Sequence, residues 1–402
     1  MHDVLVVGGG IAGLSLAISL RKAFGSDFKV ALADPALGSR LPSLRTSALV
    51  SSSKNLLAAI GIWSEIAQKA QPIWRMQLSD SRIRDAVRPF ILDFDEPVEA
   101  GTSFASMVRD SDLVACLEHE AARIGLDLRS TAISKITYGQ SYSMVDLKDG
   151  KSIRARMVIG ADGLNSKVRR ISGIEAVSHN YGRSAIVATF NHEEEHHGVA
   201  TQHFLPPGPF AMLPLIGRKS SIVWTELNRD AQAYSALPEE DLTAEVVRRF
   251  GASLGKLSLE EGPAIFPLRL HLARRFVGRR MALVGDAAHM IHPLAGQGVN
   301  LAFRDIAALV DSIAETLRDG ADIGSDACLA DYERARYFET TSMVAATHGL
   351  NGLFSNDSPT LRVLRDFGMN IVQRLPQLKR RLIKEAAGIN DQAPALLRGE
   401  LP

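Results

Sequence analysis

The sequence has little cysteine and no excess of charge of either sign. Only two of its 402 residues are cysteines, and Cys116 and Cys328 have neither metal-ligand nor Cys-x-x-Cys spacing. We expect both thiols to be reduced and buried, and we expect no metal site. With 46 basic and 45 acidic residues the net charge is +1, which gives no general electrostatic attraction to nucleic acid. Nucleic acid is therefore not an expected partner.

The chain also lacks an uninterrupted apolar run of the roughly 20 residues that a membrane-spanning helix needs. Its apolar N-terminal stretch has no basic leading region and contains a glycine-rich turn, which is not typical of a signal peptide. We therefore expect a cytoplasmic protein. Because 46% of the residues are hydrophobic, a chain of this length can bury large cores, and we expect two intertwined domains.

Glycine, by contrast, is concentrated near the N-terminus. The segment DVLVVGGGIAGLSLAISL, residues 3–20, has the pattern of a strand, a tight turn and a helix. In such a turn Gly8 allows the sharp reversal of the chain, Gly10 lets the backbone approach a pyrophosphate, and Gly13 lets the helix pack close to the strand. The spacing alone is weak evidence, because plain turns also contain glycines.

The residues after the turn strengthen this interpretation. Ile11 and Ala12 open a helix, and the free N–H groups and partial positive charge at a helix N-terminus favour phosphate. The next predicted strand, KVALADP, reaches Asp34 about 20 residues after Gly13, where a carboxylate can bind the hydroxyls of a ribose. The pattern predicts a cofactor that contains adenosine diphosphate, and it leaves NAD and FAD open.

Helical and antiparallel patterns follow along the chain. Apolar residues recur at helical spacing in 53–70 and 110–124, which predicts two helices that cover a sheet. The pair at 149–150, Asp-Gly between alternating segments, predicts a hairpin in an antiparallel meander. Residues 183–227 contain several strand patterns without intervening helices, which predicts an antiparallel sheet in a second domain.

A second glycine-rich motif follows a returning parallel strand. The strand pattern RRMALVG, residues 279–285, leads to Asp286, and Gly296 and Gly298 open another helix. This motif adds an acidic hydrogen-bond acceptor and a second helix N-terminus, which the extended FAD molecule needs and NAD does not. We expect His289 to orient the Gly-Asp turn rather than to transfer protons.

A third motif, VIGADGLNSKVRR, places Asp162 and Gly163 at the end of a strand. In this order the three motifs resemble those of the flavin-dependent aromatic hydroxylases of the para-hydroxybenzoate hydroxylase fold. The segment GDAAHMIHPLAGQGVNLAFRD is similar to the signature of the ubiquinone-biosynthesis hydroxylases within that group. The segments FLPPGPFAMLPL and LPQLKRRLIKEAAGI extend the resemblance over nearly the whole chain.

The resemblance implies an α/β fold with a discontinuous Rossmann-like FAD-binding domain, an inserted antiparallel-sheet substrate domain and a C-terminal helical region. We place the FAD-binding domain at 1–75, 101–180 and 268–320, the substrate domain at 76–100 and 181–267, and the C-terminal helices at 321–402.

The resemblance also implies which residues contact cofactor and substrate. Arg45 and Arg109 would reach the phosphates or the flavin side, Asp286 the ribitol, and the backbone of residues 298–300 the flavin ring. The full cofactor-binding set is Gly8, Gly10, Ile11, Ala12, Gly13, Asp34, Arg45, Arg109, Asp162, Asp286, Gly298, Val299 and Asn300. The flavin-edge loop, in which no single catalytic residue is assigned, contains Pro293, Gly296, Gln297 and Gly298. Phe204, Phe210, Met212 and Pro214 would wall the substrate side.

Two positions depart from the family pattern. Ser43 stands where the family often has aspartate, two residues before Arg45, and this leaves the local geometry of that arginine open. Ala302 stands where the family usually has glycine, and an alanine is tolerable there within a helix.

The activity implied by the resemblance is FAD-dependent hydroxylation of the aromatic ring of a polyprenylated phenol in ubiquinone biosynthesis. Dioxygen would be the co-substrate, a flavin C(4a)-hydroperoxide the oxygen donor, and NAD(P)H the electron donor. Two alternatives stay open. One is a flavoprotein that reduces prenyl double bonds without using oxygen, and the other is a non-catalytic FAD-binding subunit of a biosynthetic complex.

A polyprenylated phenol resides in the bilayer, so the enzyme must meet it at the membrane surface. The C-terminal segment NIVQRLPQLKRRLIKEAAGI places Leu375, Leu378 and Leu382 on one helical stripe among basic residues. We hypothesise that this helix makes a peripheral contact with the inner face of the membrane. The alternative is that it packs its apolar stripe on the protein and leaves its charges in solvent.

Overall fold

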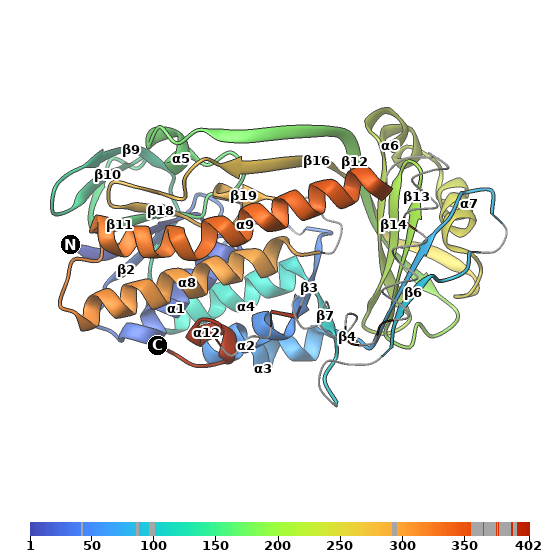
Figure 1. The fold of residues 1–402 in the computed structure, drawn as a ribbon, viewed down its shortest axis with the longest axis horizontal. Coiled ribbons are helices and arrows are strands. Elements are labelled where there is room, and N and C mark those ends of the chain that lie inside the picture. Colours follow the sequence, from blue (N-terminus) through green and yellow to red (C-terminus); the bar gives the residue numbers. More distant parts are fainter. Residues whose placement is uncertain are drawn as a thin grey trace.

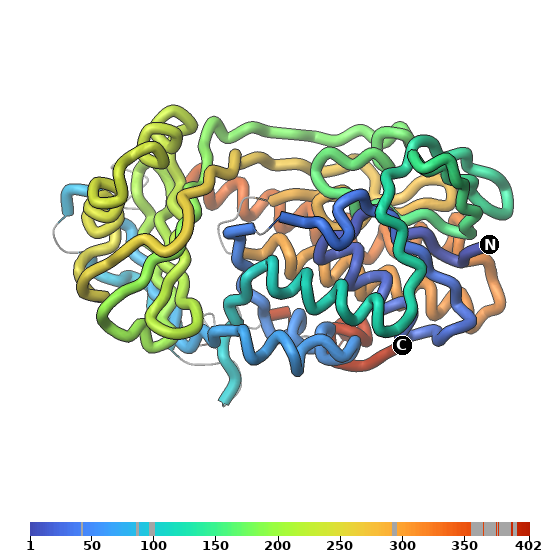
Figure 2. Tube along the Cα trace, turned by 180° about the vertical axis from the view of Figure 1, so that it is seen from behind, coloured from blue at the N-terminus to red at the C-terminus, as the bar shows by residue number. Residues whose placement is uncertain are grey.

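The computed structural model describes residues 1–41, 43–85, 88–95, 101–291 and 296–354, isolated positions between 355 and 391, and residues 392–402. Figure 1 shows two bodies side by side, one built of a sheet covered by helices and the other built of a second sheet. Two long strands, β12 (Ala176–His192) and β16 (Leu257–Ala273), run along one side of the molecule and join the two bodies. Figure 2 shows the same two strands from behind.

The first sheet is built around the N-terminal strand β1, which pairs in parallel with β2 and with β11. The parallel order continues to β8 on one side and β18 on the other, and the predicted parallel strand at 279–285 is thereby confirmed. The predicted hairpin is also confirmed, because β10 pairs antiparallel with β9 and with β11. The strands of this sheet are β17 (Val277–Gly278), β18 (Met281–Leu283), β11 (Ser152–Gly160), β1 (His2–Val7), β2 (Val30–Ala33), β8 (Asp127–Arg129), β9 (Ile133–Tyr138) and β10 (Ser143–Leu147).

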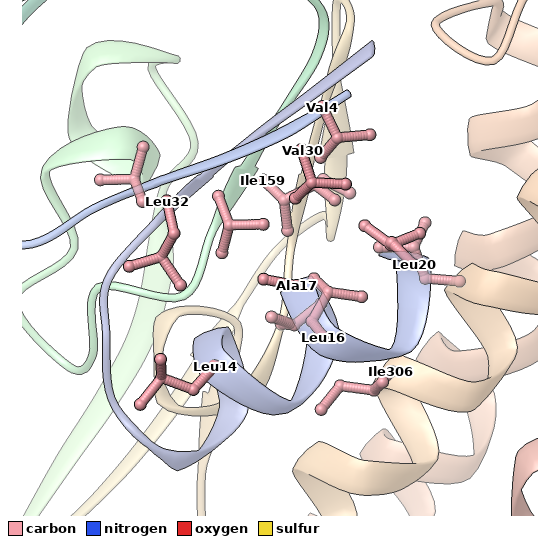
Figure 3. Close-up of a cluster of buried hydrophobic side chains, with 14 of the residues drawn as sticks. Val4, Leu14, Leu16, Ala17, Leu20, Val30, Leu32, Ile159 and Ile306 are labelled. Carbon is pink, nitrogen blue, oxygen red and sulfur yellow. The ribbon is translucent and has the colours of Figure 1, made fainter. Parts of the chain in front are cut away.

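The core of this body lies between the sheet and two helices, α1 (Ile11–Phe24) and α8 (Gly298–Arg318). In Figure 3, Leu16 and Ala17 of α1 lie between the strand residues Val4 and Ile159 and the side chain of Ile306 on α8. All five side chains are fully buried. Each buried Leu, Ile or Val contributes about 1.5–3 kcal/mol, so this packing fixes where β1 ends and α1 begins.

The helix predicted over 53–70 is interrupted. It forms α2 (Ser51–Ala59), α3 (Trp63–Ile66) and a short 3₁₀ turn at Ala67–Lys69. The break lies at Gly61, whose φ of +81° is left-handed and cannot continue an α-helix. The helix predicted over 110–124 is confirmed as α4 (Asp110–Arg123).

The second sheet confirms the antiparallel pattern predicted for 183–227, with one exception. The antiparallel order is β16–β12–β15–β14–β13, and β13 then pairs in parallel with β5, a strand from a distant part of the chain. The domain boundaries proposed near 180 and 267 fall inside β12 and β16, which run continuously through them. The remaining strands of this sheet are β19 (His289–Met290), β15 (Lys219–Leu227), β14 (Gly208–Leu215), β13 (Val199–Leu205), β5 (Arg75–Asp80) and β6 (Leu92–Phe94).

Smaller elements complete the second body and its junction with the first. Helices α6 (Asn228–Ser235) and α7 (Glu239–Phe250) cover the face of the second sheet that points away from the first body (Figure 1). A short sheet of β3 (Thr46–Val50), β7 (Ala105–Arg109) and β4 (Gln71–Ile73) lies at the junction. Helix α5 (Lys167–Ile171) follows β11.

Helix α9 (Asp326–Phe354) spans the molecule from the first body to the second (Figure 1). At its end the ring of Phe354 lies 4.1 Å from that of Phe204 on β13. Within the part of the chain that the structure describes, no helix is long and apolar enough to cross a membrane.

The C-terminal residues return to the first body. In helix α12 (Ala395–Arg398), Leu396 and Leu397 are buried in the first core. The side-chain amide of Asn55 donates a hydrogen bond of 3.0 Å to the Leu397 carbonyl. The basic helix predicted around 370–389 lies almost entirely outside the described residues, although Leu375 is described and 49% exposed.

Candidate active site

The loop between β1 and α1 contains glycines of two kinds. A Cβ at Gly8 would lie 2.3 Å from the Ala161 carbonyl oxygen, and one at Gly13 would lie 1.9 Å from the Gly8 oxygen. These two positions therefore require glycine for the loop to fold at all. A Cβ at Gly10 would meet no atom within 4 Å in the part of the chain that the structure describes. The side of the loop at Gly10, next to the first turn of α1, is thus open to a ligand.

Asp34, at the end of β2, holds this loop in shape. One carboxylate oxygen accepts the Gly9 N–H at 2.6 Å and the other accepts the Ala36 N–H at 2.6 Å, while the Arg40 guanidinium lies 3.4 Å away. A carboxylate has about four acceptor sites, so Asp34 can still accept hydrogen bonds from a ribose. The structure therefore brings together the predicted residues Gly8, Gly10, Ile11, Ala12, Gly13 and Asp34.

A second group forms at the turn after β18, where Arg45 lies near two carboxyl groups. The Arg45 Nε lies 3.9 Å from Asp110, which also accepts a 2.6 Å hydrogen bond from the Ser47 hydroxyl. Burial raises the pKa of Asp110, and it also raises the pKa of Asp286; the positive charge of Arg45 opposes both shifts. Acidic groups that are this poorly solvated are suited to accept hydrogen bonds from a bound polar ligand.

The sequence analysis missed the buried ion cluster that supports this turn. Asp305 of α8 is fully buried and accepts hydrogen bonds from the Gly285 N–H at 2.9 Å, the His289 Nε2 at 2.6 Å and the Arg336 Nε at 2.9 Å. Burial alone would raise the pKa of Asp305, but the positive charges of His289 and Arg336 hold it below its usual range. His289 thus reaches the Gly-Asp turn through Asp305. The only sequence signal was a pair of charged residues, Arg304 and Asp305, in the otherwise apolar helical segment LAFRDIAALV.

Gly285 explains how the chain tolerates Ala302 where the family usually has glycine. A Cβ at Gly285 would lie 3.3 Å from the Cβ of Ala12 and 3.3 Å from that of Ala302. Helices α1 and α8 therefore both pack against Gly285, which has no side chain. The methyl group of Ala302 fits because its neighbour has none.

The structure gives the side chain of Asp162 a capping role. One carboxylate oxygen accepts the Ser166 hydroxyl at 2.5 Å and the other accepts the Lys167 N–H at 2.6 Å and the Val168 N–H at 3.1 Å. The side chain therefore caps α5, and its contact with a cofactor stays a prediction. The residue of this motif that reaches the site is Arg169, which is buried and donates a 2.7 Å hydrogen bond to the Ala287 carbonyl.

At the start of α8, the side chain of Asn300 joins the flavin-edge loop to β3. Its amide donates to the carbonyls of Ala48 at 2.9 Å and Gly296 at 3.3 Å, and its oxygen accepts the Val50 N–H at 3.2 Å. A Cβ at Gly298 would meet no atom of the described residues within 4 Å, so among these residues the helix N-terminus there is also open. Gln297 and Val299 are described beside it, whereas Pro293 lies outside the described residues.

Arg45 and Arg109 both reach across to the second sheet. Arg109 donates a 2.6 Å hydrogen bond to Glu261 of β16, and the Arg45 guanidinium lies 5.9 Å from the ring centre of Phe266 on the same strand. The amide of Arg45 also donates to the Ser43 hydroxyl at 3.2 Å. The two predicted arginines therefore lie at the junction of the two bodies.

The structure also corrects the predicted substrate wall. Phe210 and Met212 belong to the cluster under α6 and α7, on the face of the second sheet that points away from the first body. Pro214 shares that face, because residues two apart in a strand point the same way. Only Phe204, paired with Pro209, lies on the opposite face, in contact with Phe354. The inner face of β14 instead presents Leu213 and Leu215.

Comparisons with known proteins agree with this geometry. A model of the family described as FAD binding domain matches residues 1–347. The ubiquinone hydroxylase UbiL of Rhodospirillum rubrum is 39% identical, over 99% of this chain and 92% of the relative. The 3-demethoxyubiquinol 3-hydroxylase of Escherichia coli is 31% identical, over 96% of this chain and 98% of the relative.

The solved structure of p-nitrophenol 4-monooxygenase PnpA from Pseudomonas putida has the same fold, with a TM-score of 0.79 over 96% of this chain and 98% of the other, at 19% identity. The family model and the relatives cover almost all of the described elements. The chain therefore belongs to the FAD binding domain family and is an FAD-dependent monooxygenase related to the hydroxylases of ubiquinone biosynthesis.

Proposed function

We propose that this enzyme hydroxylates the aromatic ring of a polyprenylated phenol in ubiquinone biosynthesis. The observation that carries the proposal is the similarity to UbiL, a protein named as a ubiquinone hydroxylase, over 99% of the chain. The prenyl-reductase and non-catalytic alternatives have no support among the relatives described above, which are named as hydroxylases. The site geometry is consistent with the proposal.

The residues of the first body fit FAD. The open side of Gly10 leaves room for the pyrophosphate, and the first turn of α1 points free N–H groups toward it. We assign Asp34 to the adenosine ribose and Asp286 to the ribitol. The open N-terminus of α8 at Gly298, with Val299 and Asn300, would lie against the flavin ring.

Bound in its reduced form, FAD would supply the chemistry that activates dioxygen for the transfer of one oxygen atom to an electron-rich ring. The other oxygen atom leaves as water, so each turnover consumes two electrons, for which we propose NAD(P)H as the source. The chain's own contribution is to orient the ring and to exclude water from the reaction. The Asn300 contacts to β3 fix the loop that faces this reaction.

We place the substrate against the inner face of the second sheet, because an apolar surface there meets the flavin-edge loop. The position of a Cβ at Gly296 lies 3.5 Å from the Cβ of Ala48, and Ala48 packs with Met107, Leu213 and Leu215. This surface would hold the aromatic ring. The cluster of Phe204 and Phe354 continues the apolar surface and would contact the start of the prenyl chain.

The bilayer location of such a substrate leads us to propose a peripheral membrane contact through the basic segment 374–384, and assembly with other biosynthetic enzymes. Removal of the whole tail would not test the first idea, because Leu396 and Leu397 belong to the core of the first body. Charge reversal at Lys379, Arg380 and Arg381, which lie outside the described residues, is the suitable test. It should reduce binding to phosphatidylglycerol vesicles without loss of FAD.

The function itself is tested by incubating the holoenzyme with a prenylated phenol, NAD(P)H and isotopically heavy dioxygen. We expect substrate-stimulated oxygen uptake and one heavy oxygen atom in each product molecule. A saturated prenyl chain formed without oxygen uptake would support the reductase alternative. No substrate-stimulated turnover with any ubiquinone precursor would support the non-catalytic one.

Gly298→Leu tests the loop within the same assay. A Cβ at this position meets none of the described residues within 4 Å, so we expect FAD to bind while hydrogen peroxide replaces much of the hydroxylated product. Unchanged hydroxylation in this variant would remove the loop from the proposed reaction site.

A further inference from the structure

A groove lies along the first half of α9, far from the loops that we assign to FAD. Its main hollow has a volume of about 760 Å³ and is lined by Arg275, Arg279 and Arg280 together with the apolar side chains of Val277 and Leu329. Arg279 and Arg280 immediately precede β18, whereas Asp286 follows it. The groove is therefore at the opposite edge of the sheet from the cofactor loops, where the left end of α9 lies in Figure 1.

A second hollow of about 530 Å³ continues the groove along α9. It shares Arg275 with the first hollow and adds Arg274, Arg334, Tyr337 and Phe338. Phe338 is 80% exposed, which is exceptional for a large aromatic side chain on the described surface. The groove thus combines arginines with an uncovered aromatic ring.

The lining of the groove is rich in arginine although the whole chain is nearly neutral. Five arginines line the two hollows, and three of them are paired with carboxylates beside the groove, namely Arg274 with Glu175, Arg280 with Asp322 and Arg334 with Asp331. The hollows themselves contain two carboxylates, Asp326 and Glu333. Glu333 accepts the Phe276 N–H at 2.8 Å. Arg275 and Arg279 are exposed, and neither has an ion pair with any residue that the structure describes. They are the two cations that are available to a ligand.

The position and shape of the groove restrict what it binds. A ligand at the amino edge of the sheet cannot exchange electrons or oxygen with a flavin at the carboxyl edge. A hollowed surface does not match a flat bilayer, whereas it can accept an extended chain. Arginine and aromatic side chains are enriched at the centres of protein–protein interfaces, and an exposed ring of this kind marks such sites.

We propose that this groove binds an acidic segment of a partner protein. Carboxylates of the segment would pair with Arg275 and Arg279, and an apolar side chain would cover Phe338 and Tyr337. Because the groove is remote from the substrate side, the proposal does not depend on which phenol is hydroxylated. Its test measures binding rather than turnover.

The probe is a short fluorescein-labelled peptide of Glu-Glu-Leu repeats, titrated with the FAD-loaded enzyme and followed by fluorescence anisotropy. We expect saturable binding that weakens with salt, and no binding of a Lys-Lys-Leu peptide. Arg275→Glu with Arg279→Glu should lower the affinity at least about tenfold. Phe338→Ala should lower it about threefold.

The matched control reverses two exposed arginines elsewhere, Arg154→Glu with Arg229→Glu, which changes the net charge equally. This control should retain affinity within about twofold, and both double variants should keep their FAD. An equal loss in the two double variants, or no binding of the acidic peptide, would overturn the proposal. Binding through Arg275 and Arg279 to phosphatidylglycerol vesicles but not to the peptide would show a membrane contact instead. Salt-dependent self-association lost in the groove variant would show a second copy of this chain as the occupant.

Discussion

Two turns of the first sheet have similar sequences and are stabilised in different ways. The loop from β1 to α1 is held by close backbone packing, with glycines placed against the Ala161 and Gly8 carbonyls, and by one side chain, Asp34. The turn after β18 is held by side chains from separate elements, because Asp305, His289 and Arg336 meet beneath Gly285. The shape of the first turn therefore depends mainly on the glycines of one short segment, and the second depends on several charged side chains of distant segments.

The largest effect should come from a side chain in the backbone-held loop. Gly13→Val would place its Cβ 1.9 Å from the Gly8 oxygen, and we expect it to lower the free energy of unfolding by at least about 4 kcal/mol. Urea denaturation measures this. Gly10→Val is the matched control and should change stability by less than about 1 kcal/mol. Equal stability of the two variants would contradict the division of the glycines into two kinds.

The turn after β18 should be destabilised when its central carboxylate, Asp305, loses its charge. Asp305→Asn leaves Arg336 and His289 buried beside a neutral group, and we expect a loss of about 3 kcal/mol in the free energy of unfolding. We also expect about tenfold weaker FAD binding, because Gly285 and Asp286 lose their support. Glu315→Gln, on the exposed side of the same helix, is the control. If both variants unfold at the same urea concentration, the cluster does not support the turn.

Substitutions of the two acidic residues that we assign to FAD should differ in their effects on stability, as the two turns do. Asp34→Ala removes the acceptor of the Gly9 and Ala36 N–H groups, so it should cost about 2 kcal/mol of stability as well as FAD affinity. Asp286→Ala should weaken FAD binding at least about tenfold and leave the stability of the FAD-free protein nearly unchanged, since burial already disfavours its charge. Full retention of FAD in Asp286→Ala would show that the ribitol contact is misassigned.

The smallest predicted effect is a pH dependence of the free energy of unfolding that comes from His271, near His289. Burial, with Arg169 and His289 nearby, lowers the pKa of His271 to about 4. The unfolded chain, with an ordinary histidine pKa near 6.5, therefore binds a proton first as the pH falls. The stability from this group is present above pH 6.5 and is lost as the pH falls toward 4.

Replacement by glutamine sharpens this prediction. His271→Gln should remove on the order of 1 kcal/mol of the decline in unfolding free energy between pH 6.5 and 4. Urea denaturation at several pH values measures the slope. An unchanged slope would show that His271 titrates normally in the folded protein.

The contrast between the turns also explains how far the sequence could be interpreted. Parallel strands, the β10–β11 hairpin and the loop at Gly8, Gly10 and Gly13 were predicted correctly because each depends on neighbouring residues. The break at Gly61 was missed, because a helical pattern of apolar residues continues on both sides of it. Local pattern thus predicts an element more reliably than its interruption.

Contacts between distant segments could not be predicted from the sequence. The pairing of Phe204 with Pro209 places Phe204 and Phe210 on opposite faces of the sheet, and alternation along the sequence gives neither this register nor the side that a helix covers. The ion cluster of Asp305 required the relative positions of α8, α9 and β19, and the capping role of Asp162 required the exact turn before α5. These assignments depend on three-dimensional packing rather than on spacing along the chain.

The central claim is that the open side of Gly10 is where FAD binds, and a flavin-fluorescence titration of FAD-free Gly10→Val tests it most directly. A Cβ there meets no atom of the described residues within 4 Å, and a valine would occupy the space that we assign to the pyrophosphate. We expect the natural protein to bind FAD saturably and the variant, with an unchanged circular dichroism spectrum and urea midpoint, to bind at least about 100-fold more weakly. Binding of FAD by the folded variant within about threefold of the natural protein would contradict the account.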